Sequence, residues 1–323
     1  MIEDSENICG YCKQADSEVL YHALDVFGCI YYINKCNKCK AYFLAPRPGE
    51  KALEEAYDSS YYGEKEEKFK PTFERVMDYF RLKRAKYLSK HLADNSKVLD
   101  IGCGNGRFLL NLLKFGNFRL YGTELEGNSA KRASIIAEIN LKIGSLKKED
   151  FEPDTFDAVT LFHVFEHLTE PQEALQTISE IIKKDGVLVI SFPNITSIQS
   201  KLFKGKWLHL DPPRHLFYFK PRDFIKLMNT YGFELVRQKY FSIEQNPYGM
   251  SQSILNLFFT KREILFERLK GNKHYAKECS WFNIFMQKAF FIGSFPLFIL
   301  SDLFASLLRK GATVEFTFKK ANH

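Results

Sequence analysis

The chain has 323 residues and a mass of 37.7 kDa, which is enough for two or three domains. Hydrophobic residues make up 45% and charged residues 26%, so the composition excludes an intrinsically disordered protein. The formal net charge of +7 is too small for this length to indicate a nucleic-acid-binding protein. The amino-terminal residues are acidic and lack the apolar run of a secretory signal, so we expect a cytoplasmic protein with reduced cysteines.

Four of the seven cysteines lie in residues 1–45 as two C-x2-C pairs. Cys9 and Cys12 form the first pair, and Cys36 and Cys39 form the second after an intervening segment typical of short strands. This spacing predicts a zinc ribbon in which four thiolates hold a structural zinc ion. So short a segment buries little core, and we therefore expect it to fold only with the metal. Four free structural cysteines are the alternative.

A charged, Tyr-rich stretch follows at residues 46–70, and the apolar stripe of residues 71–94 predicts a helix. Amphipathic segments then alternate with short apolar runs. One is residues 129–139, and a second begins at Pro171 and is expected to end at Gly186. The predicted strands are residues 97–101, 118–124, 141–145, 156–164, 186–192, 233–241 and 312–321. This alternation predicts an α/β fold with a mostly parallel sheet covered on both faces.

A glycine-rich loop follows the first strand predicted after residue 95. Gly102, Gly104 and Gly106 allow the backbone to turn sharply around a ligand before a helix begins. A dinucleotide-binding loop would have its third glycine where this chain has Arg107. Glu124 ends the next strand, where a carboxylate can accept hydrogen bonds from both ribose hydroxyls. A solvated loop charge is the alternative for Glu124.

The loop, its preceding aspartate and the later Phe-Asp pair resemble the motifs of class I S-adenosylmethionine-dependent methyltransferases. The resemblance implies a Rossmann-like sheet that binds S-adenosyl-L-methionine. It places Asp100 near the methionine amino group, Glu124 at the ribose and the residues after the third strand at the adenine. The residues thus assigned to the cofactor are Asp100, Gly102, Gly104, Gly106, Glu124, Ser145, Leu146 and His163.

With this resemblance the chain divides into four regions. These are a zinc-ribbon-like segment with four cysteines at 1–45, a Tyr-rich linker and helix at 46–94, the methyltransferase domain at 95–242 plus 312–323, and a basic, aromatic helical insertion at 243–311.

The segment HVFEHL begins at His163 and follows the fourth predicted strand of the domain. It departs from the N/D-P-P-Y/F motif of many DNA and protein amine methyltransferases. It instead resembles methyltransferases of small molecules, including quinone-ring methylating enzymes. Some relatives carry E-x-x-E-H here and bind a divalent ion, but His163 replaces their first ligand. Glu166 and His167 are candidate catalytic residues, with a hydrogen-bonded pair at a helix start as the alternative.

The whole layout resembles a bacterial group of methyltransferases from polysaccharide, lipid and secondary-metabolite pathways. The resemblance rests on the cysteine segment, the linker FLAPRPG…YDSSYY, HVFEHL and a later loop. In this loop, the residues that match the pattern are Pro193, Asn194, Trp207, His209, Asp211, Pro213, Arg214 and His215. They are expected to form a loop that roofs the acceptor pocket. If the acceptor is a hydroxyl, His215 is the first candidate for the base and His167 the second. A loop histidine that fixes Asp211 or the backbone is the alternative for His215.

Residues 251–311 contain nine lysines and arginines, four acidic residues and twelve aromatic residues. The run at 289–308 is long enough to cross a bilayer, but Pro296 is expected to interrupt it, and the final strand must return to the sheet. We therefore expect a helical hairpin lying in an anionic membrane surface, with surface cations that include Arg262. A buried helical lid over the acceptor pocket is the alternative.

The sequence thus predicts an S-adenosylmethionine-dependent methyltransferase whose acceptor is a small molecule, either a glycan or a lipid-linked, isoprenoid intermediate. The expected location is cytoplasmic, with a peripheral position at the inner membrane surface as a variant. Two other classes stay open. One is a nucleic-acid or protein methyltransferase in which the ribbon reads the substrate, and the other is a non-catalytic protein that binds the cofactor at a membrane.

Overall fold

The computed structural model describes residues 8–57, 71–259, 261–269, 275 and 279–321, so most of the Tyr-rich stretch lies outside the described residues. The central sheet contains β4 (Lys97–Ile101), β5 (Arg119–Glu124), β6 (Ile139–Ile143), β7 (Phe156–Phe162), β8 (Ile182–Pro193), β10 (Phe233–Lys239) and β11 (Thr313–Lys320). Its order is β10-β11-β8-β7-β4-β5-β6, and β11 runs antiparallel to both of its neighbours. The predicted α/β class and all seven predicted strands are confirmed.

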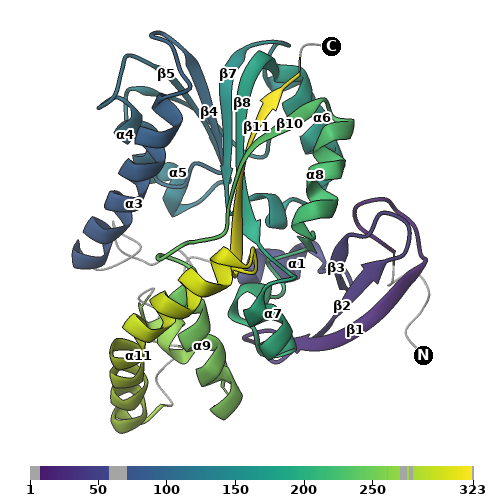
Figure 1. Cartoon of the computed structure of the whole chain (residues 1–323), viewed down its shortest axis with the longest axis vertical. Coiled ribbons are helices and arrows are strands. Elements are labelled where there is room, and N and C mark those ends of the chain that lie inside the picture. Colours follow the sequence, from purple (N-terminus) through teal and green to yellow (C-terminus); the bar gives the residue numbers. More distant parts are fainter. Residues whose placement is uncertain (1–7, 58–70, 260, 270–274, 276–278, 322–323) are drawn as a thin grey trace.

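Helices cover both faces of this sheet (Figure 1). On one face, Leu88 and Leu109 share a buried cluster with sheet residues, and on the other face Ile178 and Phe224 do so. The helices of the first face are α3 (Pro71–Ser89), α4 (Arg107–Leu112) and α5 (Asn128–Ala133), and those of the second are α6 (Pro171–Ile181) and α8 (Pro221–Thr230). The sheet is therefore buried, and ligands can approach it at its edges.

The prediction that the helix from Pro171 ends at Gly186 is wrong. The helix ends at Ile181, and β8 begins at once because Ile182 already pairs with Phe156 of β7. Gly186 lies within the strand, where an added Cβ would come 2.8 Å from the Lys183 carbonyl oxygen. The glycine there therefore permits close packing and does not terminate a helix. The predicted helix at 129–139 is also shorter, since α5 ends at Ala133.

The amino-terminal cysteine segment, called the ribbon below, forms an antiparallel sheet that joins the main body. Its strands are β1 (Ser17–Leu24), β2 (Ile30–Cys36) and β3 (Tyr42–Ala45), and β9 (Phe217–Tyr218) extends the sheet. Phe43 pairs with Phe217 across the β3–β9 junction. Cys9, Cys36 and Phe43 belong to the same buried cluster as Phe192 of the central sheet. The segment therefore shares its core with the α/β domain.

The insertion forms α9 (Asn246–Phe258), α10 (Ile264–Leu269) and α11 (Trp281–Leu307). α9 covers the predicted roofing loop, where the Leu208 amide donates to the Ser253 hydroxyl at 2.9 Å. Arg262 is not the surface cation that the sequence suggested. Its side chain is buried and donates to the carbonyl oxygens of Leu24 and Gly205, which tie the insertion to the ribbon.

The long helix α11 packs on α9 and projects away from the sheet (Figure 1). Most of its other side chains are exposed. It continues through Pro296, so the prediction that this residue interrupts it is wrong; the proline lies on the exposed face, where a lost backbone hydrogen bond meets solvent. Among the described residues, α11 alone is long and apolar enough to cross a membrane. Its buried side chains are only Ile284, Gln287, Asp302 and Ala305. A buried lid therefore does not describe α11.

Candidate functional site

The glycines of the loop after β4 serve two different purposes. An added Cβ on Gly102 would lie 2.5 Å from Val164, and one on Gly106 would lie 2.7 Å from Ile139. These two positions have positive φ and no room for a side chain. Gly104 also has positive φ, at +59°, but no atom of the described residues lies within 4 Å of an added Cβ. The open space over Gly104 is where a ligand can approach the backbone.

Two buried carboxylates flank this loop. The Gly104 amide donates to Glu124 Oε2 at 2.6 Å, and the Thr160 hydroxyl donates to Asp100 Oδ1 at 2.6 Å. Burial raises the pKa of Asp100 to about 7, against the opposing effect of the Thr160 hydrogen bond; the negative charge of Glu124 raises it further. Two nearby carboxylates in a buried setting favour a cationic ligand with hydroxyl donors. Such a cradle fits S-adenosylmethionine, which the resemblance implies.

The predicted adenine-lining residues follow β6. The Gly144 amide donates to the Glu124 carbonyl oxygen at 2.8 Å, which holds the end of β6 beside the end of β5. Ser145 is exposed, its carbonyl oxygen accepts from Lys142, and Leu146 is half-buried against the main core. Gly144 has a φ of +116° with open space above it, as at Gly104. The structure therefore brings this segment beside Glu124, the residue predicted to bind the ribose.

Arg84 of α3 is a site residue that the sequence interpretation missed. It forms an ion pair with Glu244, and its charge interacts with that of Asp100. The available signal was its spacing, because Arg84 lies four residues from Phe80 and from Leu88 on the apolar stripe of the helix. A cation in such a stripe points toward the core and requires buried anionic partners.

His163 follows β7 in a left-handed conformation, with a φ of +56°. Its Nδ1 lies 3.4 Å from Glu166 Oε1. Burial, aided by the positive charge of Arg84, lowers the pKa of His163 to about 3. The next residue, Val164, contacts Gly102. The segment from His163 therefore lies directly against the glycine loop that follows β4.

Glu166, His167 and His215 form a buried cluster. Their ligand atoms all lie within 4.8 Å of one another, and His215 Nε2 is 4.0 Å from Glu166 Oε1. His215 Nδ1 lies 2.9 Å from the His209 carbonyl oxygen, and His167 Nδ1 lies 3.0 Å from that of Arg214. A carbonyl can only accept, so both Nδ1 atoms carry the proton and both Nε2 atoms keep a lone pair.

The carboxylate of Glu166 has no hydrogen-bond partner at either oxygen among the described residues. Burial raises the pKa of Glu166, although the neighbouring His215 and His167 charges act in the opposite direction. Burial also lowers the pKa of His215, and that of His167 to about 4. This arrangement can act in two ways. A histidine Nε2 can accept a proton while the carboxylate stabilises the resulting charge, or the three side chains together can hold a divalent cation.

Residues from two other regions hold the cluster in place. The Tyr57 hydroxyl lies 2.9 Å from His167 Nδ1, and Arg214 donates to the Ala56 carbonyl oxygen at 3.2 Å. Arg214 also pairs with Asp211, which lies 3.8 Å from His215 Nε2. Tyr57 was not among the candidate residues, because nothing in its local sequence indicates contact with a residue 110 positions away.

The four cysteines of the amino-terminal segment converge. Cys9 Sγ lies 3.7 Å from Cys39 Sγ, and Cys12 Sγ lies 3.5 Å from Cys36 Sγ. A tetrahedral zinc site with Zn–S bonds of about 2.3 Å requires sulfurs about 3.8 Å apart. The Cys39 amide also points to Cys36 Sγ at 3.5 Å. The four thiols can therefore hold a metal ion, as their spacing predicts.

The chain is similar in sequence to known methyltransferases. The curated relatives include ubiquinone biosynthesis O-methyltransferases. That of Neisseria meningitidis serogroup A is 28% identical over 120 residues, which are 34% of this chain and 50% of the relative. That of Rickettsia typhi is 27% identical over 179 residues, or 51% of this chain and 72% of the relative. The chain thus spans about half the length of the Neisseria relatives that it matches.

Solved structures with a related arrangement include the YcgJ protein from Bacillus subtilis, at a TM-score of 0.47 and 14% identity over 76% of this chain and 100% of that one. Another is geranyl diphosphate C-methyltransferase from Streptomyces coelicolor, at a TM-score of 0.45 and 12% identity over 74% of this chain and 79% of that one. A family model described as methyltransferase domain matches residues 73–238, just over half of the chain. The chain therefore belongs to the methyltransferase-domain family.

Proposed function

We propose that this protein transfers a methyl group from S-adenosylmethionine to a hydroxyl of a lipid-linked small molecule. The observation that carries the proposal is the contact between two sites. Gly102 of the cofactor loop packs against Val164, which lies one residue after His163 and two residues before the buried Glu166. The methyl donor and the group that accepts the proton would therefore lie side by side at the carboxyl edge of the sheet.

The cofactor side of this arrangement rests on four residues. Glu124 would accept hydrogen bonds from the ribose hydroxyls, and Asp100 would attract the methionine amino group. Gly104 and Gly144 would leave room for the ligand beside the backbone. When bound, S-adenosylmethionine supplies an electrophilic methyl group on a sulfonium sulfur, so the protein has mainly to position the acceptor.

The acceptor side needs a group that takes the hydroxyl proton. His215 fits this role, because burial lowers its pKa and keeps the imidazole neutral at physiological pH. The hydrogen bond from His215 Nδ1 to the His209 carbonyl oxygen directs His215 Nε2 toward Glu166. The carboxylate of Glu166 would then stabilise the imidazolium that forms as His215 accepts the proton. His167 would flank the same carboxylate.

An oxygen acceptor is supported by the names of the ubiquinone biosynthesis O-methyltransferases, to which the chain is 26–31% identical. A lipid-linked acceptor is supported by the exposed apolar surface of α11, which includes Phe282, Ile292 and Leu297 at 62%, 71% and 63% exposure. Exposed apolar surface of this extent marks an interaction site. We propose that α11 lies in the plane of an anionic membrane surface, near its acceptor.

An in-plane position fits the contacts of the insertion better than a spanning one. α9 packs along α11, and Arg262, between α9 and α10, is tied to the ribbon and to Gly205. A spanning α11 would carry these segments away from the sheet that β11 joins directly after the helix. Zinc held by Cys9, Cys12, Cys36 and Cys39 would have a structural role, since all four positions of the tetrahedron would be filled by thiolates.

The proposal is tested by incubating the protein with methyl-labelled S-adenosylmethionine and a bacterial membrane extract. Label should enter the solvent-extractable lipid fraction and withstand nuclease and protease treatment. The His215→Gln variant should lower the labelling rate by roughly 100-fold or more while cofactor affinity stays unchanged. Label in nucleic acid or protein would favour the alternative methyltransferase class. Cofactor binding without any labelling would favour a non-catalytic protein.

A further inference from the structure

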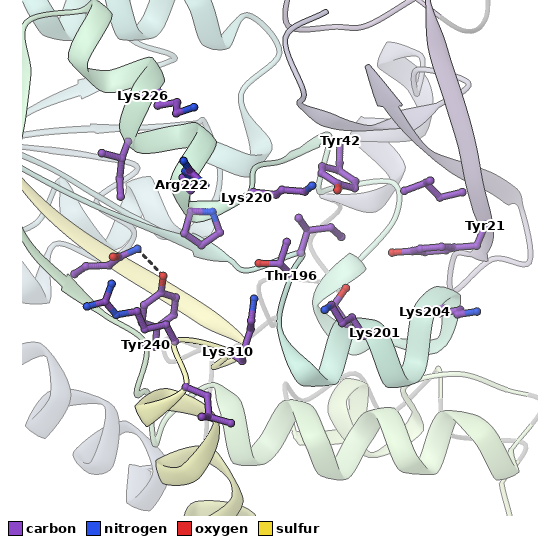
Figure 2. Close-up of a pocket in the computed structure, with 18 residues that line it drawn as sticks. Tyr21, Tyr42, Thr196, Lys201, Lys204, Lys220, Arg222, Lys226, Tyr240 and Lys310 are labelled. Carbon is purple, nitrogen blue, oxygen red and sulfur yellow. Dashed lines mark hydrogen bonds between the residues drawn. The ribbon is translucent and has the colours of Figure 1, made fainter. Parts of the chain in front are cut away.

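A cavity distinct from the glycine loop and the Glu166 cluster lies between the ribbon and the α/β domain. It has a volume of about 1190 Å³. Its walls are β1 and β3 of the ribbon, α7 (Ile198–Phe203), α8, the end of β10 and the segment that links α11 to β11. Figure 2 shows basic side chains on opposite sides of this cavity, from α8 on one side and from α7 and Lys310 on the other.

The charged side chains that line this cavity are all positive. Among the described residues that line it there is no aspartate or glutamate. Its seven cations are Lys201, Lys204, Lys220, Arg222, Lys226, Arg309 and Lys310. None of the seven forms an ion pair with any carboxylate in the part of the chain that the structure describes. Cations gathered around one cavity repel each other and create a positive potential that attracts an anion.

Hydrogen-bond donors accompany this charge. Four residues that carry hydroxyl groups, Tyr21, Tyr42, Thr196 and Ser200, line the cavity. Burial raises the pKa of Tyr21 to about 12, so its hydroxyl keeps its proton at physiological pH. The amino terminus of α8 also borders the cavity at Pro221, and the backbone dipole there favours negative charge. Lysines, hydroxyls and a helix amino terminus together are the donors that phosphate oxygens require.

We propose that this cavity binds a phosphate or diphosphate ester group. An apolar surface adjoins the cavity at the end of α11. Leu308 lines the cavity and is 52% exposed beside the apolar surface of that helix. A ligand with a phosphate group next to an apolar chain therefore matches both surfaces. The phosphate can belong to a membrane phospholipid or to a lipid-linked substrate. This binding requires no methyl transfer, so it can fail while the proposed function holds.

The direct test is calorimetric titration with inorganic pyrophosphate. The wild-type protein should bind it, and affinity should fall at least tenfold in Lys201→Glu/Lys226→Glu, which reverses two exposed cations on opposite walls. The matched control is Lys90→Glu/Lys184→Glu, which makes the same charge change at exposed positions outside the cavity. Unchanged S-adenosylmethionine binding in both variants would establish that they fold. No pyrophosphate binding in the wild type, or equal losses in both variants, would overturn the proposal.

Vesicles identify the source of the phosphate. The wild-type protein is mixed with phosphatidylglycerol vesicles, with and without pyrophosphate. Displacement by pyrophosphate, together with a loss of vesicle binding in Lys201→Glu/Lys226→Glu, would assign the cavity to a phospholipid head group. Pyrophosphate binding that leaves vesicle binding unchanged would assign it to a substrate-borne phosphate. Both results support a phosphate site, whereas vesicle binding that is equal in all variants, without any pyrophosphate binding, contradicts it.

Discussion

At the scale of single residues, the site depends on where the chain leaves space and where it does not. Gly104 and Gly106 have similar backbone conformations, with φ of +59° and +73°, yet only Gly106 is packed against neighbouring side chains. The same conformation therefore serves ligand access at one position and core packing at the other.

This contrast predicts different outcomes for two alanine substitutions. Gly104→Ala should fold with a loss of about 1–2 kcal/mol from backbone strain, but it should weaken S-adenosylmethionine binding at least tenfold because the methyl group occupies ligand space. Gly106→Ala should lose the same strain energy and roughly a further 1–3 kcal/mol of the free energy of unfolding, because its Cβ would overlap Ile139. Thermal unfolding and calorimetric titration of both variants would check this. Equal cofactor affinities would contradict it.

The raised pKa of Asp100 predicts a pH dependence for cofactor binding. This pKa is about 7, so the carboxyl is largely protonated at pH 6 and ionised at pH 8. An ammonium ligand favours the ionised form, so affinity should rise with pH across this window and binding should release a proton. Calorimetry in buffers of different ionisation enthalpy would detect that proton. Asp100→Asn should abolish the release, and a persistent release would contradict the assignment.

The same group affects stability in a defined direction. The folded-state pKa of Asp100 lies above the ordinary value of 3.8, so between about pH 4 and pH 7 the folded state binds more protons than the unfolded state. The contribution of this carboxyl to the free energy of unfolding therefore decreases as pH rises through that window. Asp100→Asn removes the buried charge, and its stability relative to the wild type should be higher at pH 8 than at pH 5. Thermal unfolding at the two pH values would measure this.

At the scale of elements, α11 predicts membrane binding through its exposed apolar face. Phe282→Glu/Leu297→Glu should reduce flotation with anionic liposomes at least tenfold, because two charged groups would have to enter the apolar layer. Both side chains are more than 60% exposed, so the unfolding temperature should change little. Ile135→Glu is a control at an exposed apolar position outside α11. Wild-type protein that stays at the bottom of the gradient at low salt would exclude the anchor.

The cysteine segment predicts that metal loss spreads beyond it. Purified protein should carry about one zinc ion per chain, and Cys36→Ser should release it. Cys36 shares a buried cluster with Phe43 and Phe217, so hydrogen exchange should increase in β3 and β9 as well as around the cysteines. Metal analysis and hydrogen exchange would measure both effects. A metal-free wild-type protein purified under reducing conditions would refute the zinc site.

At the scale of the whole molecule, the sequence predicts strands more reliably than it predicts junctions. The run at 97–101 is the strand observed, because buried parallel strands are short apolar runs with little ambiguity. The two-residue strand β9, which joins the ribbon to the domain, has no pattern of its own. Helix ends also escaped prediction where strand pairing overrode a glycine, as at Gly186.

The site was likewise predictable only where a local sequence pattern indicates it. The resemblance made Asp100 a candidate and motif spacing made Glu124 one, and both lie at or near the ends of predicted strands. Glu166, His167 and His215 were named individually, but their meeting depends on the loop that brings His215 back beside Glu166. Arg84 and Tyr57 reach the site from segments whose local sequence gives only an amphipathic helix and a polar stretch. Long-range contact of this kind is a property of the folded chain.

The central claim is that the glycine loop and Glu124 bind S-adenosylmethionine, and calorimetric titration of this cofactor tests it most directly. The wild-type protein should bind S-adenosylmethionine, and Glu124→Ala should weaken binding by about 2–4 kcal/mol, because a buried carboxylate that accepts two ribose hydroxyls is lost. The thermal unfolding of the variant serves as the control for folding. A wild-type protein without measurable affinity, or a folded Glu124→Ala variant with unchanged affinity, would contradict the account.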